Sequence, residues 1–182
     1  MTSHDHESHS RRLAPGKRVL MLVENNFPTD TRVRNEAYTL VEHGYQVTVI
    51  CLKADGERSR EVVGGVTVYR VPTLTVFRKL PASDTSRLKR FARQVLVLAG
   101  YVIEYAYFTT ACFLVSLYVA FREGFDIVHA HNPPDTLVLV TVPLKLLGKK
   151  SVYDHHDLAA ELYLSRYRTT RENLITLSLI HI

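Results

Sequence analysis

Two short segments in the second half of the chain carry the residues best suited to chemistry. Each is an apolar, β-branched run that ends in histidine, asparagine or aspartate: Phe125-Asp126-Ile127-Val128-His129-Ala130-His131-Asn132-Pro133 and Ser151-Val152-Tyr153-Asp154-His155-His156-Asp157. A helix-like apolar stretch separates them, which is the pattern of a β-α-β unit. Open α/β sheets bind ligands at the carboxyl ends of their parallel strands. We therefore expect a site at this edge, with four histidines and two aspartates on it.

The histidine pair of the first segment lies at the end of a predicted strand. His129 and His131 are two residues apart, so their side chains point the same way. We interpret His129 as a hydrogen-bonded structural residue and His131, closer to the edge, as the functional one. Asn132 follows directly at the start of the next helix, and we take it as a substrate-binding residue.

The second segment allows two interpretations. Its Asp-His-His resembles the signature of the DHH phosphoesterases, which use paired manganese ions; the ligands here would be His129, His131, Asp154 and His156. That family also needs an earlier Asp-x-Asp at a strand end, where this chain has Glu24-Asn25-Asn26, so the set is short of carboxylates. The other interpretation is sugar binding, with Asp157 capping a helix and His156 presented to a polar ligand.

The first predicted strand, 17–23, leads into a loop and then a helix over about 30–43 without a G-x-G-x-x-G motif. Arg32 and Arg34 fall in the first turn of that helix, where the macrodipole disfavours cations by roughly 0.3–1 kcal/mol each. An anion held between them and the helix amides would explain this placement. Pairing of Arg32 with Glu36 on a solvated face explains it equally well. The residues that we predict to bind substrate here are Asn25, Asn26, Asp30, Arg32 and Arg34.

The remaining pattern indicates an α/β fold with a Rossmann-like, doubly wound, mostly parallel sheet. Strands are predicted over 46–52 and, after a Gly64-Gly65 turn, over 66–71. The segment 134–147 is apolar all round, as expected of a buried crossover helix, and Pro143 should kink it. Residues 1–16 are polar and without periodicity, which predicts a disordered tail.

Composition fits a folded protein, with 46% hydrophobic and 23% charged residues among 182. Two cysteines make no disulfide framework and no secretory signal opens the chain, so the cytoplasm is the expected compartment. A basic cluster (Arg87, Lys89, Arg90, Arg93) begins a long helical segment, 83–122, in which residues 95–121 contain one charge, Glu104. The strands on either side belong to one sheet, which argues against a lone membrane span. We slightly favour a helix lying on an anionic membrane surface over a buried helix, and expect no nucleic-acid binding.

The last six residues, 177–182, can be encoded by CTG TCT CTT ATA CAC ATC. This string matches the transposon end used to tag DNA in sequencing libraries. We therefore expect that the natural reading frame departs near Thr176 and that residues 177–182 are an adapter artefact.

Taken together, these pieces resemble the N-terminal domain of family 4 glycosyltransferases over about 17–167. The strongest marks, in order, are Asp30-Thr31-Arg32-Val33-Arg34-Asn35-Glu36-Ala37, Leu40-Val41-Glu42-His43-Gly44-Tyr45, Gly65-Val66-Thr67-Val68-Tyr69-Arg70-Val71-Pro72, Asp126-Ile127-Val128-His129-Ala130-His131 and Val152-Tyr153-Asp154-His155-His156-Asp157. The resemblance implies the first domain, 17–176, of a GT-B fold. Where many members have a glycine pair after the first strand, this chain has Asn25-Asn26.

The resemblance also implies an activity: transfer of a sugar, with retention and without a metal or other cofactor, from a nucleotide-sugar donor to a glycan or lipid-linked acceptor. His131 matches the family's histidine near the reacting sugar. The domain that holds most of the donor site, with two glutamates eight residues apart, has no counterpart here. We thus expect the acceptor half of a cytoplasmic, membrane-peripheral glycosyltransferase, inactive as this fragment. A DHH-type phosphoesterase and a non-catalytic sugar- or lipid-binding module are the alternatives.

Overall fold

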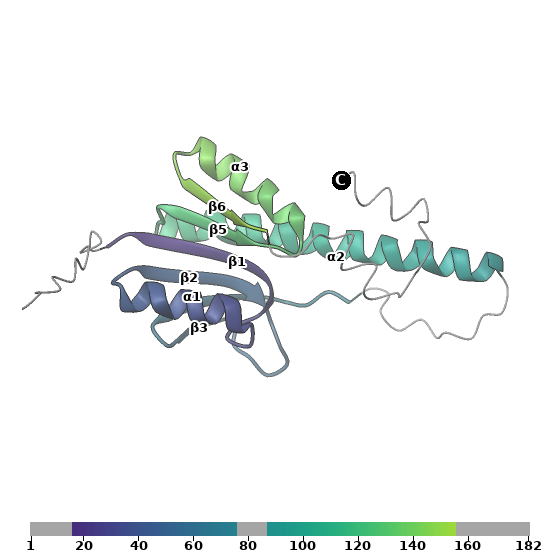
Figure 1. Ribbon diagram of the computed structural model, residues 1–182, viewed down its shortest axis with the longest axis horizontal. Coiled ribbons are helices and arrows are strands. Elements are labelled where there is room, and N and C mark those ends of the chain that lie inside the picture. Colours follow the sequence, from purple (N-terminus) through teal and green to yellow (C-terminus); the bar gives the residue numbers. More distant parts are fainter. Residues whose placement is uncertain (1–15, 76–86, 156–182) are drawn as a thin grey trace, which may run out of the picture.

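The computed structural model describes residues 16–75 and 87–155 (Figure 1). The predicted tail up to residue 15, the candidate residues His156 and Asp157, and the 177–182 segment lie outside these ranges. The elements are β1 (Arg18–Asn26), α1 (Thr31–Glu42), β2 (Gln46–Leu52), β3 (Arg60–Val63), β4 (Val66–Val71), α2 (Arg87–Arg122), β5 (Ile127–His131), the 3-10 turn η1 (Asp135–Leu137), α3 (Val138–Leu146) and β6 (Lys150–Asp154).

The strands form one sheet in the order β3-β4-β2-β1-β5-β6. Only β3 is antiparallel to its neighbour, β4, and the other pairs are parallel. From β1 the chain moves outward through β2 to the β3–β4 hairpin, and α2 then carries it back to β5 on the other side of β1. The direction of winding therefore reverses between β1 and β5. This confirms the predicted doubly wound, mostly parallel α/β sheet.

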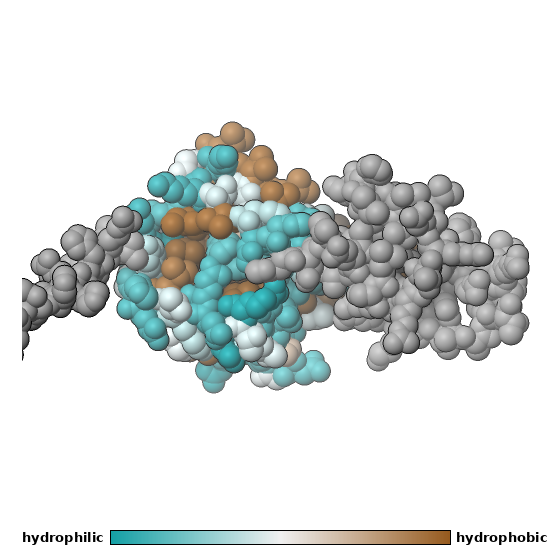
Figure 2. Space-filling model, in the orientation of Figure 1, coloured by the Kyte–Doolittle hydropathy of each residue, from teal (hydrophilic) through white to brown (hydrophobic). Residues whose placement is uncertain are grey.

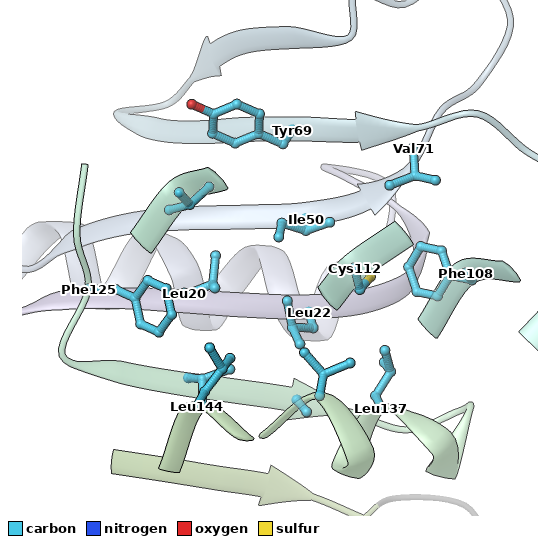
Figure 3. Packing of buried hydrophobic residues seen from close by; sticks show 14 residues of the cluster. Leu20, Leu22, Ile50, Tyr69, Val71, Phe108, Cys112, Phe125, Leu137 and Leu144 are labelled. Carbon is cyan, nitrogen blue, oxygen red and sulfur yellow. The ribbon is translucent and has the colours of Figure 1, made fainter. Parts of the chain in front are cut away.

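Alternate residues of β1 face two different helical layers. Val19, Met21 and Val23 belong to the cluster that packs against α1. Leu20 and Leu22 belong to a second cluster on the opposite face, completed by side chains from α2 and α3 (Figure 3). A central parallel strand must be covered on both faces, which explains why β1 reads as an unbroken apolar run. Burial of each such side chain contributes about 1.5–3 kcal/mol to folding.

Helix α1 begins and ends where the sequence predicts. Asp30 is its N-cap residue, in extended conformation, and the Asp30 side chain accepts hydrogen bonds from the amides of Arg32 and Val33. At the other end Gly44 has a φ of +83° and its amide bonds to the carbonyl of Val41. A left-handed residue after the last turn is a common helix stop, and glycine adopts it without strain.

The prediction that segment 134–147 forms a helix buried on all sides is wrong. After η1 only one face of α3, including Val140 and Leu144, is buried. The opposite face carries exposed apolar residues, among them Leu139, Val142 and Leu146. Figure 2 shows brown surface over the top of the molecule, where Figure 1 labels α3. The reason is geometric: α3 forms an outer layer over the β5–β6 side of the sheet, so it can bury only the stripe that faces the strands.

Helix α2 is the longest element, with 36 residues. Phe108, Cys112, Ser116 and Val119 recur on one face and are buried. Its segment Val95–Arg122 is long and apolar enough to cross a membrane, with a mean hydropathy of 1.5 and 22% of the segment's most apolar window buried. A core helix of this length would bury more of its surface, so α2 has an unpartnered apolar side among the described residues.

Candidate functional site

His131 is the last residue of β5 and pairs in register with Val23 of β1, at the point where the winding of the sheet reverses. Val128 and Ala130 pack into the α2–α3 layer, so His129 and His131 face the α1 layer instead. Their rings lie together, with centroids 4.1 Å apart. The prediction that both side chains point the same way is confirmed.

Two carboxylates complete this group. The Nδ1 atom of His129 lies 2.9 Å from Oε1 of Glu36, a residue of α1. His131 lies between Glu36, 3.9 Å from its Nε2, and Asp154 of β6, 3.3 Å from its Nδ1. We call Glu36, His129, His131 and Asp154 the histidine cluster. It joins three elements that are far apart in the sequence.

Glu36 is the site residue that sequence reasoning missed. The proposed Arg32–Glu36 pair does not form; Arg32 instead lies 3.2 Å from the carboxylate of Asp30, its N-cap neighbour. A signal was nevertheless present, because Glu36 is three residues after Val33 and adjacent to Ala37, the two buried positions of α1. A residue at that spacing points toward the sheet rather than into solvent.

Burial sets the protonation state of the cluster. The side chain of His131 is 1% exposed, and burial, aided by the neighbouring His129, lowers its pKa to about 4. Burial by itself raises the pKa of Glu36, but the hydrogen bond from His129 and the two imidazoles bring it below its ordinary value. His131 is therefore neutral near pH 7. Its Nε2 atom is buried and has no hydrogen-bond partner among the described residues.

This protonation state predicts how stability depends on pH. The unfolded chain binds a proton at His131 near pH 6.5, whereas the folded chain resists it until about pH 4. The free energy of unfolding should therefore fall as pH drops from about 6.5 toward 4, by up to roughly 3 kcal/mol from this residue. Urea denaturation of the 182-residue chain between pH 7 and 4.5 measures it. His131→Asn should flatten this slope, and an unchanged slope would contradict the assignment.

The cluster also has donor atoms that a transition metal accepts. One ligand atom from each of the four residues lies within 4.8 Å of the others. A tetrahedral zinc site needs ligand atoms roughly 3.4 Å apart, from metal–ligand bonds of about 2.0–2.1 Å. The side chains would have to draw together and give up the Glu36–His129 hydrogen bond. His156, the fourth ligand of the phosphoesterase alternative, lies outside the described residues.

The predicted residues of the β1–α1 loop bond to one another and to the segment after β2. Asn25 donates to the carboxylate of Asp30 at 3.1 Å, and Asn26 donates to Glu57 at 3.0 Å. Burial raises the pKa of Asp30, but the bonds from Arg32 and Asn25 outweigh it and hold the pKa below its usual value. The Asp30 carboxylate is thus committed to the helix cap and to its neighbours. Arg34, half-buried, lies one turn further into α1.

The loop after β5 is built around Asp135. Its Oδ1 atom accepts hydrogen bonds from Asn132, at 3.1 Å, and from the hydroxyl of Tyr153, at 2.7 Å. His155 lies 3.9 Å from the same oxygen. Asn132 is 1% exposed. The structure therefore gives Asn132 a part in holding this loop against β6, and its predicted contact with substrate stays a prediction.

The fold and this edge define a Rossmann-like α/β domain with its polar site at the winding reversal, the place where such sheets receive ligands. A family model described as a glycosyl transferase 4-like domain matches residues 29–179, and the chain belongs to this family. No curated protein matches it significantly.

Among solved structures the chain is similar to sucrose-phosphate synthase from Thermosynechococcus elongatus, with 14% identity and a TM-score of 0.46. The alignment covers 90% of this chain and 39% of that one. A second structure under the same protein name and organism gives 12% identity and a TM-score of 0.40, covering 91% and 94% of the two chains. The chain thus spans well under half of the first of these structures.

Proposed function

We propose that this chain is the acceptor-side domain of a retaining glycosyltransferase that moves a sugar from a nucleotide-sugar donor to a glycan or lipid-linked acceptor. Its family membership supports transferase chemistry. In this proposal a further domain of the complete protein supplies most of the donor site, and the present chain alone is inactive. The proposed sugar transfer needs no metal or other cofactor.

The observation that carries the proposal is the state of His131. His131 is a neutral imidazole at the carboxyl edge of the sheet, and its buried Nε2, which has no hydrogen-bond partner among the described residues, has one hydrogen bond to offer a sugar hydroxyl that reaches it. Arg32, 41% exposed in its side chain and placed at the N-terminus of α1, is the cation best placed to meet a phosphate of the donor.

The test is to recover the source gene through the codon for Thr176 and assay its complete product. We expect acceptor-dependent release of nucleotide from a nucleotide-sugar, with the 182-residue chain giving no turnover. The downstream sequence should hold two glutamates eight residues apart. A product that cleaves phosphoesters with manganese and leaves nucleotide-sugars intact would replace this proposal with the phosphoesterase alternative.

We further propose that α2 lies on the inner face of an anionic membrane, which would make the enzyme cytoplasmic and peripheral. Leu114, Tyr118 and Phe121 recur at helical spacing and are 60%, 49% and 88% exposed. Basic residues gather at the start of the same helix, 87–93. Each Lys or Arg near anionic lipid contributes about 1 kcal/mol, and the apolar side would enter the interface.

Sedimentation with vesicles tests this placement. The chain should bind vesicles of phosphatidylcholine and phosphatidylglycerol more strongly than vesicles of phosphatidylcholine alone. The double variant Leu114→Glu, Phe121→Glu should lose at least about tenfold in binding, because two charges then face the hydrocarbon boundary. Val62→Glu is the matched control, since Val62 is 66% exposed but lies on β3. Equal binding by all three proteins would rule out α2 as the membrane surface.

A further inference from the structure

We propose that the histidine cluster binds one zinc ion through Glu36, His129 and His131, and that the bound ion stops sugar transfer by occupying His131. The binding of zinc is independent of the proposed transferase function, whereas the inhibition rests on that function. The ligand class is therefore a divalent transition metal that regulates the candidate site and is not a cofactor of the reaction.

The donor atoms of these three residues lie close to the spacing that one ion requires. Oε1 of Glu36 lies 2.9 Å from Nδ1 of His129, and Oε2 of Glu36 lies 3.9 Å from Nε2 of His131. Zinc bonds of about 2.0–2.1 Å put tetrahedral ligands roughly 3.4 Å apart, so each separation has to change by only about half an ångström. Two imidazoles and one carboxylate form a common zinc ligand set, which leaves a fourth position open.

The orientation of His131 favours a cation at this point. Nδ1 of His131 lies 3.3 Å from Asp154, and a hydrogen bond donated there leaves the lone pair on Nε2. This Nε2 faces the carboxylate of Glu36, and it has no hydrogen-bond partner among the described residues. A metal ion between the two would satisfy both acceptors. Histidine ligands of metals usually donate their second ring N–H to a carboxylate, which is the part that Asp154 takes here.

The burial of the cluster allows an ion to enter from one side. The side chains of His131 and His129 are 1% and 11% exposed, whereas that of Glu36 is 37% exposed and gives access from solvent. Imidazole nitrogens suit zinc, while magnesium and manganese prefer sites made of oxygen ligands. The cluster should therefore bind zinc more tightly than manganese, the metal of the phosphoesterase alternative.

Calorimetric titration of the 182-residue chain with zinc sulfate tests the binding. Other histidines of the chain could add weak sites, so the titration is repeated after replacement of the three N-terminal ones by asparagine: His4, His6 and His9. This tail-substituted chain should still bind one zinc ion, and manganese should bind at least about tenfold more weakly. In the same chain zinc should shift the imidazole nitrogen NMR resonances of His129 and His131, a readout that leaves the cluster unchanged.

Substitutions in the tail-substituted chain then assign the ligands. His131→Asn and Glu36→Gln should each weaken zinc binding at least about tenfold, and Asp154→Asn should weaken it by about 10–100-fold, the usual cost of losing a group that orients a ligand. His43→Asn is the matched control, because His43 is an exposed histidine at the end of α1, and it should leave the affinity unchanged. Thermal melting reports whether each variant folds.

Zinc should also inhibit transfer by the complete enzyme, with half of the effect at a free zinc concentration equal to the dissociation constant, and EDTA should restore the rate. Three results would overturn the inference: no zinc bound by the tail-substituted chain, unchanged affinity in folded His131→Asn, or full transfer at saturating zinc. The two proposals fail separately. Transfer without zinc binding removes the metal site and keeps the function, whereas zinc binding by a complete protein that transfers no sugar does the opposite.

Discussion

Replacement of His131 by asparagine should lower kcat of the complete enzyme by roughly two to four orders of magnitude, the usual cost of losing a group that exchanges a proton or hydrogen bond in the transition state. His131 is neutral and fixed between Glu36 and Asp154, and its Nε2 has no hydrogen-bond partner in the part of the chain that the structure describes. Asparagine fills part of the same space but cannot present an imidazole nitrogen at that point. The loss should fall on kcat more than on KM for either substrate.

The pH dependence separates a chemical role from a structural one. With His131 intact, its pKa of about 4 means that activity should not fall through this residue until the pH is well below 6. His43→Asn is the matched control, because His43 is an exposed histidine bonded only locally, to the carbonyl of Thr39. Thermal melting of each variant reports folding. Transfer by a folded His131→Asn enzyme at near the unmodified rate would show that the site assignment is wrong.

The sequence predicts those parts of the fold that depend on local patterns. Apolar periodicity and the helix stop at Gly44 depend on local geometry, so most of the order of strands and helices follows from them. The exposure of α3 does not. It depends on how many helices share one face of the sheet, and the run 138–144, which is apolar except for Thr141, contains no information on that number. The turn before β4 was predicted from Gly64 and Gly65, which take positive φ values of 57° and 83°, whereas the strand before it, β3, was not predicted.

The candidate site was predictable along the strands but not between elements. The alternation of β5 placed His129 and His131 on one side, and parallel pairing brings Asp154 to the same edge. Glu36 reaches the histidines only because α1 covers that face, which is a fact of tertiary packing. Asp30 illustrates the opposite limit: its type and position fit both a helix cap and a ligand contact, and the structure assigns its carboxylate to the cap.

Arg70 is a buried charged residue whose loss should destabilise the fold, and its pattern in the sequence, an arginine inside a strand, gave no sign of this. Its side chain is 1% exposed and lies 2.9 Å from Glu57 and 2.6 Å from Glu61. Its Nη2 atom also donates to the carbonyl of Phe27, at 3.1 Å. One buried guanidinium thus ties β4 and its hairpin partner β3 to the loop that follows β1.

Arg70→Met should lower the free energy of unfolding by about 3 kcal/mol. Loss of one partner from a buried ion pair costs about 3–5 kcal/mol, and the lower end applies because Glu57 and Glu61 keep side-chain exposures of 24% and 34% and can regain water. The free energy of unfolding of Arg70→Lys should lie between those of the unmodified chain and Arg70→Met. The ammonium of lysine keeps the charge but cannot reach both carboxylates and the carbonyl in one plane. Urea denaturation gives the three values, and equal midpoints would contradict the assignment.

The loss of Arg70 should also affect the candidate site, because Arg70 donates a hydrogen bond to the carbonyl of Phe27. That bond fixes the loop carrying Asn25, Asn26 and Asp30, so a stretch of chain at the proposed ligand edge depends on an arginine two strands away. The amides of Arg32 and Val33 bond to Asp30. Relative to the unmodified chain, Arg70→Met should accelerate the hydrogen exchange of these two amides by a larger factor than that of the β5 amides. Arg60→Met is the control, because Arg60 pairs with Glu123 on an exposed surface. Uniform acceleration across all strands would instead mean that Arg70 stabilises the fold as a whole and not this loop in particular.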